Sequence, residues 1–316
     1  MLRRAGVVCM VCAGWFGVEM HGQGLPPPRA AGNTTTIELS PLLVAADKMY
    51  RGEISVTNGG IPAIMSGMAD VATNAETQLL RQSVDDPDLR VIFTVAESLY
   101  RIVARKSAGI HGVADLKGKR ITTPRNTSAH YYLVKMLATK HLTEADVTLV
   151  NITLVTEMST ALKDGRVDAV AMWEPEAERA IAAVGSDAIV LQDRRVYREL
   201  FNLNTSAKVL AEPEKRRAVV ELVRSLITSS EAIRQRPREY WPLIAMKLSY
   251  SVETVSKSWP DLRYAGGMAA DLLDVMTEEE VWVAKERNRT PRTRAQLSAL
   301  IDRSVLEEAM RKRGGQ

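Results

Sequence analysis

The segment that decides the fold has the sequence Gly165-Arg-Val-Asp-Ala-Val-Ala-Met-Trp-Glu-Pro175. A glycine and an aspartate precede an apolar run, which predicts a turn followed by a buried strand; the polar loop and proline after it predict the start of a helix. The same order occurs about a hundred residues earlier, in Gly67-Met-Ala-Asp-Val-Ala72, which is followed by Thr73 and Asn74. The repeat predicts two α/β units of related topology.

Strands that alternate with helices predict open, mostly parallel sheets, in which ligands bind beyond the carboxyl ends of the strands. Thr73 and Asn74 follow one such strand directly, and Trp173 and Glu174 follow the other. We expect the two lobes to face each other across these loops and to enclose a cleft. The structural alternatives are that Trp173 packs in the core and that Glu174 only forms an ion pair, for which Arg125 is a plausible partner.

A third loop with possible ligand contacts lies between strand 120–123 and a helix that begins near Ser128. Asn126, Thr127 and Ser128 are small polar residues of the kind that cap helices. The free N–H groups and the dipole at a helix start favour an anion, so we expect an anionic group of a ligand here. The alternative is a cap without a ligand. His130 is a further candidate, with a helix-surface position as its alternative.

The chain before Gly67 is expected to contribute one more contact. Residues 37–39 (Ile-Glu-Leu) predict the first strand, and Ser40-Pro41 predicts the helix that follows it, with Ser40 as the cap or as a ligand contact. From Glu212 to the end the pattern is almost wholly helical, which predicts a C-terminal tail packed on the first lobe.

Composition and charge exclude several classes of protein. The chain has 316 residues, 46% of them hydrophobic and 25% charged, with a net charge of +4 and no basic stripe with interleaved aromatic residues. We therefore expect a soluble globular protein that does not bind nucleic acid.

The N-terminus has the features of a secretory signal, which we place at residues 1–24. Arg3 and Arg4 precede the apolar run 5–18. Both cysteines, Cys9 and Cys12, lie inside it, so the exported chain has no disulfide and no cysteine metal site. Five Asn-x-Ser/Thr sequons leave periplasmic export and eukaryotic secretion both open.

The sequence resembles the solute-binding proteins of ABC importers for sulfonates, taurine, nitrate and thiamine-pyrimidine precursors. The stretches that carry the resemblance cover nearly all of the exported chain, and the most specific of them is Gly165 to Pro175. The other stretches are residues 58–72, 107–120, 130–132, 146–151, 237–239, 259–260 and 301–302. The resemblance implies a type II periplasmic-binding-protein fold, with residues 33–105 and 206–316 in lobe 1 and residues 106–205 in lobe 2. It also implies a monomer that binds one small ligand, uses no cofactor or metal and delivers the ligand to an ABC permease. Near the site the sequence departs from the family, at 39–41 and 50–53.

Because Glu174 is expected to face the anion site, a zwitterion such as an aminosulfonate fits better than nitrate. The alternative function is an enzyme on the same fold, a pyrimidine-precursor synthase or a menaquinone-pathway lyase. The synthases rely on a cysteine-rich segment that the exported chain lacks. A third class, the effector domain of a regulator, would need a DNA-binding or membrane segment that we do not find.

Overall fold

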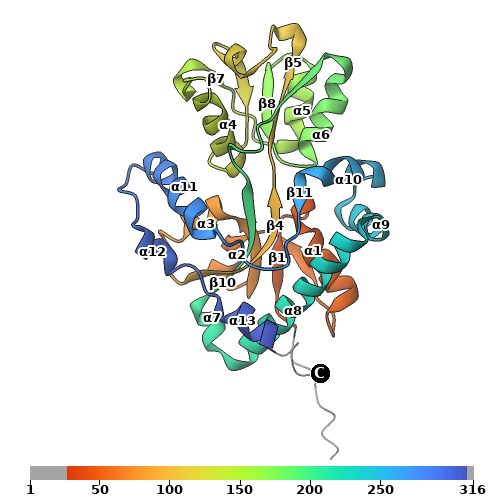
Figure 1. The fold of residues 1–316 in the computed structure, drawn as a ribbon, viewed down its shortest axis with the longest axis vertical. Coiled ribbons are helices and arrows are strands. Elements are labelled where there is room, and N and C mark those ends of the chain that lie inside the picture. The colour runs from red at the N-terminus through yellow and green to blue at the C-terminus, as the bar shows by residue number, and fades with distance from the viewer. Residues whose placement is uncertain (1–26, 312–316) are drawn as a thin grey trace, which may run out of the picture.

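The computed structural model describes residues 27–311, which form two lobes, each built on one mixed sheet with helices on both faces (Figure 1). The predicted signal peptide and both cysteines lie outside the described residues.

Lobe 1 contains a six-stranded sheet in the order β11-β4-β10-β3-β1-β2. Three neighbouring strands, β2, β1 and β3, are parallel, whereas β10 is antiparallel to β3 and β4, and β11 is antiparallel to β4. The strand bounds are β1 Ala30–Gly32, β2 Val56–Asn58, β3 Val71–Ala75, β4 Leu89–Ser98, β10 Glu199–Ser206 and β11 Leu262–Arg263.

Lobe 2 repeats this arrangement in a five-stranded sheet in the order β7-β6-β8-β5-β9. Again three neighbours, β7, β6 and β8, are parallel, and β5 is antiparallel to β8 and β9. The strand bounds are β5 Arg101–Arg105, β6 Arg120–Thr122, β7 Thr148–Leu149, β8 Ala169–Met172 and β9 Ala188–Leu191. The sheets are therefore mixed rather than mostly parallel, because the strands next to the lobe crossings run against their neighbours.

The helices bury the apolar faces of both sheets. Lobe 1 has one core between its sheet and helices α1, α8, α9, α10 and α13. A second core includes helices α2, α3, α11 and α12. In lobe 2, one face of the sheet packs against α5 and α6, and the other face packs against α4. The bounds are α1 Ser40–Val44, α2 Ile61–Met65, α3 Glu76–Gln82, α4 Ser128–Ala138, α5 Val155–Lys163, α6 Glu176–Val184, α7 Ala207–Ala211, α8 Pro213–Gln235, α9 Pro237–Leu248, α10 Val252–Ser258, α11 Leu272–Glu286, α12 Arg294–Ser298 and α13 Ser304–Arg311.

The first copy of the repeated Gly-x-x-Asp pattern joins two parallel strands. Asp70 precedes β3 and accepts hydrogen bonds from the backbone N–H of Arg29 (3.0 Å) and from its guanidinium (2.7 and 3.0 Å), just before β1. The same guanidinium donates to the carbonyl of Gly67 at 2.7 Å. Burial alone would raise the pKa of Asp70, but the contacts with Arg29 outweigh it and lower that pKa.

The second copy makes the same connection in lobe 2. Asp168 precedes β8 and accepts from the backbone N–H of Arg120 (2.9 Å) and from its guanidinium (2.8 Å), while Arg120 also donates to the carbonyl of Gly165 at 2.8 Å. Both glycines have positive φ (73° and 71°), which a residue with a side chain rarely adopts. The internal repeat in the sequence is thus a structural device that sets the register between parallel strands.

The chain crosses between the lobes twice, at residues 99–100 between β4 and β5 and at residues 192–198 between β9 and β10. The sequence-based boundaries, after residue 105 and after residue 205, differ from this. Strand β5 pairs with β8 and β9 in lobe 2, and β10 pairs with β3 and β4 in lobe 1. The reason is that residues 89–105 form a nearly continuous β pattern, so the crossing leaves little mark in the sequence.

The first strand was also predicted at the wrong place. Residues 37–39 form a 3₁₀ turn, and the first strand is β1, which lies between β2 and β3. Its residues are small because space is short: a Cβ on Gly32 would lie 2.7 Å from the Oγ1 of Thr73. Such a short, small-residue strand carries little β-propensity in the sequence.

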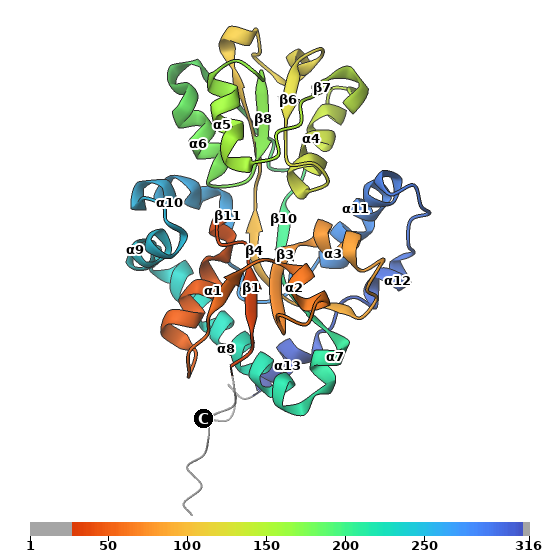
Figure 2. The ribbon, with the colours of Figure 1, turned by 180° about the vertical axis from the view of Figure 1, so that it is seen from behind.

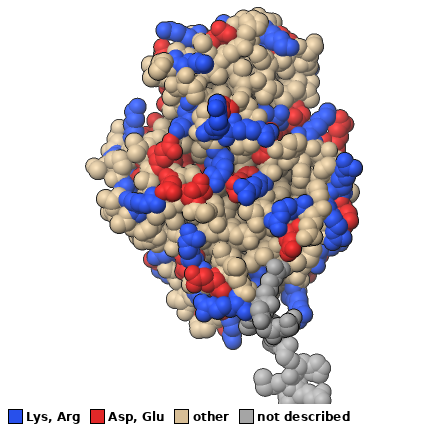
Figure 3. Space-filling model, in the orientation of Figure 1, with Lys and Arg blue, Asp and Glu red and all other residues tan. Residues whose placement is uncertain are grey.

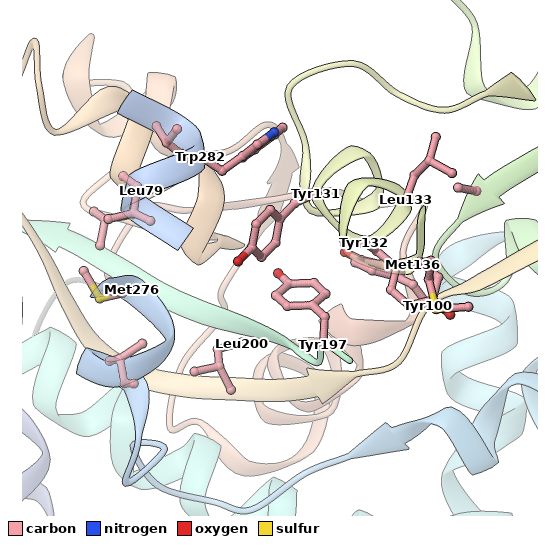
Figure 4. Close-up of a cluster of buried hydrophobic side chains, with 14 of the residues drawn as sticks. Leu79, Tyr100, Tyr131, Tyr132, Leu133, Met136, Tyr197, Leu200, Met276 and Trp282 are labelled. Carbon is pink, nitrogen blue, oxygen red and sulfur yellow. The ribbon is translucent and has the colours of Figure 1, made fainter. Parts of the chain in front are cut away.

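The C-terminal helices pack on lobe 1, as predicted: Val91 in β4 bonds through its backbone to Leu300 and Asp302, at 2.8 and 2.9 Å. Both views place α11 beside α3 and place α4 of lobe 2 on the same side (Figures 1 and 2). Tyr131 on α4 contacts Trp282 on α11 and Tyr197 of the second crossing, with ring centroids 5.3 and 5.2 Å apart (Figure 4). The two lobes therefore share a buried aromatic contact.

Candidate functional site

A cavity of about 710 Å³ lies between the lobes, within the range of small-molecule sites. Lobe 1 and the first crossing supply most of its wall, and lobe 2 supplies the loop before α4 and Trp173. The lining residues are Asn33, Thr36, Glu38, Asn58, Gly59, Gly60, Pro62, Ala63, Met68, Asn74, Ala75, Gln78, Arg81, Gln82, Tyr100, Arg125, Asn126, Thr127, Ser128, Trp173, Glu199 and Phe201.

The start of α4 faces this cavity. Thr127 is the N-cap residue and Ser128 is the first residue of the helix, so the unpaired N–H groups of the first turn lie at the wall. Asn126 is held with φ 61°, and the Nδ1 of His130 accepts a hydrogen bond from its backbone N–H at 3.2 Å. The other ring nitrogen of His130 lies 2.7 Å from Glu144. His130 is fully buried and fixes the loop rather than lining the cavity.

Two residues with guanidinium groups, Arg81 and Arg125, line the same cavity as the start of α4. Arg81 lies on α3, and the neighbouring Gln78 donates to the carbonyl of Asn126 at 3.0 Å, which ties α3 to this loop. The Nη1 of Arg81 is buried and has no hydrogen-bond partner within residues 27–311, and burial lowers the pKa of this group. Arg125 is exposed and forms no ion pair with any described residue. Both cations are therefore available to a ligand.

Asn74 and Thr73 point to opposite faces of β3, as the strand period requires. The Oδ1 of Asn74 accepts from the backbone N–H of Ile61 at 2.8 Å, which fixes the start of α2 beside the cavity. A Cβ on Gly60 would lie 2.2 Å from this oxygen, so the turn before α2 requires glycine there. Thr73 is fully buried on the other face and lies outside the cavity lining.

The cavity floor carries two carboxyl groups. Glu38 follows β1, and Glu199 opens β10 directly opposite Ser98 of β4. Ser98 donates to Glu38 at 2.8 Å, and Thr36 also donates to it. Burial raises the pKa of Glu38, and burial together with the charges of neighbouring glutamates holds the pKa of Glu199 well above its usual value.

Five of the nine predicted site residues line the cavity: Asn74, Asn126, Thr127, Ser128 and Trp173. The other four, Ser40, Thr73, His130 and Glu174, are buried outside it.

Ser40 lies outside the cavity because residues 37–39 form a turn rather than a strand. Its hydroxyl donates to the carbonyl of Ile37 at 2.6 Å, and the N-cap of α1 is Leu39.

Glu174 has a different partner from the one we predicted. It accepts a hydrogen bond at 2.7 Å from Arg101, the first residue of β5, and not from Arg125. Arg101 also contacts Glu178 at 2.9 Å and Asp261 of lobe 1 at 3.5 Å. Burial raises the pKa of Glu174 to about 7 although the charge of Arg101 acts in the opposite direction. Glu174 therefore belongs to an ion-pair network between the lobes and does not line the cavity.

Sequence reasoning missed Glu38, Arg81, Tyr100 and Glu199, and considered Arg125 only as a partner for Glu174. A signal existed for Arg81, because Gln78, Arg81 and Gln82 recur at helical spacing after the candidate Asn74. No comparable pattern marks Glu199, since β10 mixes polar and apolar residues without regular alternation and is buried throughout.

Among residues 27–311, no three His, Cys, Asp or Glu side chains are arranged to hold a metal ion. Of the helices in this range, none has the length and apolar character that crossing a membrane requires. Lys and Arg are interspersed with Asp and Glu over the face drawn in Figure 3, without a continuous patch of one sign.

Comparison with solved structures identifies the fold. The alkanesulfonate-binding protein SsuA of Xanthomonas axonopodis pv. citri, bound to MOPS, has a TM-score of 0.67 at 17% identity, over 87% of this chain and 98% of that one. The periplasmic nitrate-binding protein NrtA of Synechocystis PCC 6803 has a TM-score of 0.73 at 11% identity, over 91% and 90%. The desulfurization enzyme DszB has a TM-score of 0.61 at 15% identity, over 91% and 100%. The fold is that of type II periplasmic binding proteins, which both binding proteins and an enzyme share.

No curated protein matches the sequence. The model of the NMT1/THI5-like family matches residues 55–239, which is more than half of the chain and includes both copies of the Gly-x-x-Asp pattern. This protein therefore belongs to the NMT1/THI5-like family.

Proposed function

We propose that this protein is an exported solute-binding protein that takes a small anionic or zwitterionic organic solute, sulfonate-like in its anionic group, into the cavity between the lobes. The observation that carries the proposal is a set of unused hydrogen-bond donors that belong to residues lining the cavity. They comprise the first-turn N–H groups of α4, the guanidinium groups of Arg81 and Arg125, and the buried indole N–H of Trp173, which has no acceptor within the described residues.

These donors suit an anion with several oxygen atoms. A sulfonate offers three equivalent acceptors, and a helix start and an arginine both favour such groups. Because the donors come from both lobes, a bound anion would hold the lobes together. We expect opening and closing to occur by hinge motion at the two crossings, residues 99–100 and 192–198.

The partners follow from the same proposal. A protein of this kind acts as a monomer and passes its solute to an ABC-type permease, which fits a secreted or periplasmic location after removal of residues 1–24. The structural similarity to SsuA and NrtA, at 17% and 11% sequence identity, supports the fold. It does not identify the ligand, which has to be found by experiment. The enzymatic alternative is weaker, because the described cavity lining contains no Cys, His or Lys.

The test combines native mass spectrometry of freshly purified protein with calorimetric titration against ethanesulfonate, taurine, MOPS and nitrate. We expect at least one sulfonate to bind, and Arg81→Gln to weaken it by tenfold or more, since hydrogen bonds to charged groups contribute about 1.5–3 kcal/mol. Arg294→Gln is the control, because Arg294 pairs with Asp274 and does not line the cavity.

Two results would contradict the proposal. One is that no anion binds and no small molecule co-purifies. The other is that Arg81→Gln and Arg294→Gln have equal effects, which would place the anion elsewhere.

A further inference from the structure

The floor of the cavity presents an acidic surface that the proposed anion site does not explain. Glu38 and Glu199 both line the cavity, although only 1% and 4% of their surfaces are exposed. They come from segments more than 150 residues apart and meet through Ser98, which donates to Glu38 and pairs across the sheet with Glu199.

Neither carboxyl group has a basic partner. Within residues 27–311, no Lys, Arg or His nitrogen lies within 4.0 Å of either of them, although the chain forms many ion pairs elsewhere. The neighbouring titratable groups are Tyr100 from the first crossing and Glu76 from α3, and neither is a cation. The floor is therefore a pair of buried acids that face an open cavity.

Buried carboxyl groups outside the cavity are stabilised in two ways: Glu76 accepts hydrogen bonds from Tyr197 and from the backbone N–H of Leu200, and Glu174 has a cation. Glu174 is equally buried, but Arg101 contacts it directly and it does not line the cavity. Burying an ionised carboxylate without a cation or a full set of hydrogen bonds is costly. Burial raises the pKa of both groups at the floor and so favours their protonated forms, and a cationic group that enters the cavity can take the place of that proton.

Resting on the proposed function, we infer that Glu38 and Glu199 bind a cationic group with several N–H donors, such as an ammonium or amidinium, on the same solute whose anionic group lies at the start of α4. The ligand is then a zwitterion, and the floor carboxyl groups discriminate against simple anions of the same length. Two carboxyl groups can accept more hydrogen bonds than one, which suits a group with two or three N–H bonds.

The test compares compounds that share an anionic group and differ in the cation. The pairs are taurine with ethanesulfonate, 3-aminopropanesulfonate with propanesulfonate, and β-alanine with propionate, each titrated into the full exported chain by calorimetry. We expect the zwitterion of at least one pair to bind tenfold or more tightly than its partner. Glu38→Gln and Glu199→Gln should each remove most of that difference and leave the affinity for the simple anion unchanged or higher.

Glu76→Gln is the matched control, because Glu76 is buried beside the floor but does not line the cavity. If the floor carboxyl groups act by direct contact, this variant should keep the preference for the zwitterion. Circular dichroism on each variant checks that it is folded. Binding of the simple anion with unchanged or higher affinity shows that the anion site is intact.

The outcomes separate the inference from the function on which it rests. Equal affinity of wild type for both members of every pair that binds would overturn the inference and leave the proposed function standing. An equal loss of preference in Glu76→Gln would also overturn it, by replacing direct contact with a general effect of negative charge. Failure of every compound to bind would overturn both.

Discussion

The stability of the folded protein should fall as the pH rises from 5 to 8, because buried glutamates bind protons more tightly in the folded chain than in the unfolded chain. Glu76 is fully buried, accepts hydrogen bonds from Tyr197 and from the backbone N–H of Leu200, and has its pKa raised by burial from 4.5 to about 7. Burial and nearby carboxyl groups also raise the pKa of Glu279 well above its usual value.

The sign follows from proton counts. Between pH 4.5 and pH 7 the folded protein holds a proton on Glu76 that the unfolded chain has lost, so stability decreases with pH over this interval. A shift from 4.5 to about 7, at about 1.4 kcal/mol per pH unit, gives about 3 kcal/mol from Glu76 alone. Aspartates with lowered pKa, such as Asp70 and Asp168, act in the opposite direction but only below about their usual pKa of 3.8. They do not affect the pH 5 to 8 window.

Urea unfolding at pH 5, 6, 7 and 8, followed by tryptophan fluorescence and circular dichroism, measures this slope. Glu76→Gln should match wild type near pH 5 and exceed its stability at pH 8 by about 3 kcal/mol, because the amide cannot ionise. Glu253→Gln removes an exposed carboxylate that pairs with Lys257 and should leave the slope unchanged. A wild-type stability that rises between pH 5 and 8, or a Glu76→Gln slope equal to that of wild type, would refute the reasoning.

Three further predictions concern other parts of the molecule. Arg101→Met should lower the free energy of unfolding by about 3–5 kcal/mol, because it leaves Glu174 buried without its cation; adding Glu174→Gln should restore most of the loss in the same urea assay. Ser128→Asp should weaken binding of a sulfonate by more than tenfold in calorimetry, because it places a negative charge at the start of α4; unchanged affinity would exclude that position as the anion site. N-terminal sequencing of secreted protein should find a start between residues 22 and 31, and an intact Met1 in cytosolic protein would contradict export.

The parts of the fold that could be predicted are those in which the sequence repeats a local pattern. Gly67 to Asp70 and Gly165 to Asp168 precede buried strands in both lobes, and the structure uses both aspartates to join parallel strands. The helical C-terminal tail was likewise visible, because its apolar residues recur at helical spacing. These features depend on residues close together in the chain.

The parts that could not be predicted depend on pairing between distant segments. The sequence alone does not show that Ala30 to Gly32 is a central strand, because such small residues have little β-propensity; only contact with Leu39 and Thr73 explains them. The lobe boundary was misplaced for a related reason, since β4 and β5 form one β-rich segment that changes sheets at residues 99–100.

The candidate site shows most clearly why a residue's type and local position do not decide its role. Glu174 and Glu199 are both buried glutamates; Glu174 follows β8 and Glu199 begins β10. The sequence favours Glu174, because it follows an apolar run and a tryptophan. The tertiary structure reverses the choice. Arg101 reaches Glu174 from the neighbouring strand β5, whereas the strands beside Glu199 supply Ser98 and no base. A buried carboxyl group that the fold has already paired is part of the scaffold, and one that the fold leaves unpaired at a cavity is the better candidate for a ligand contact.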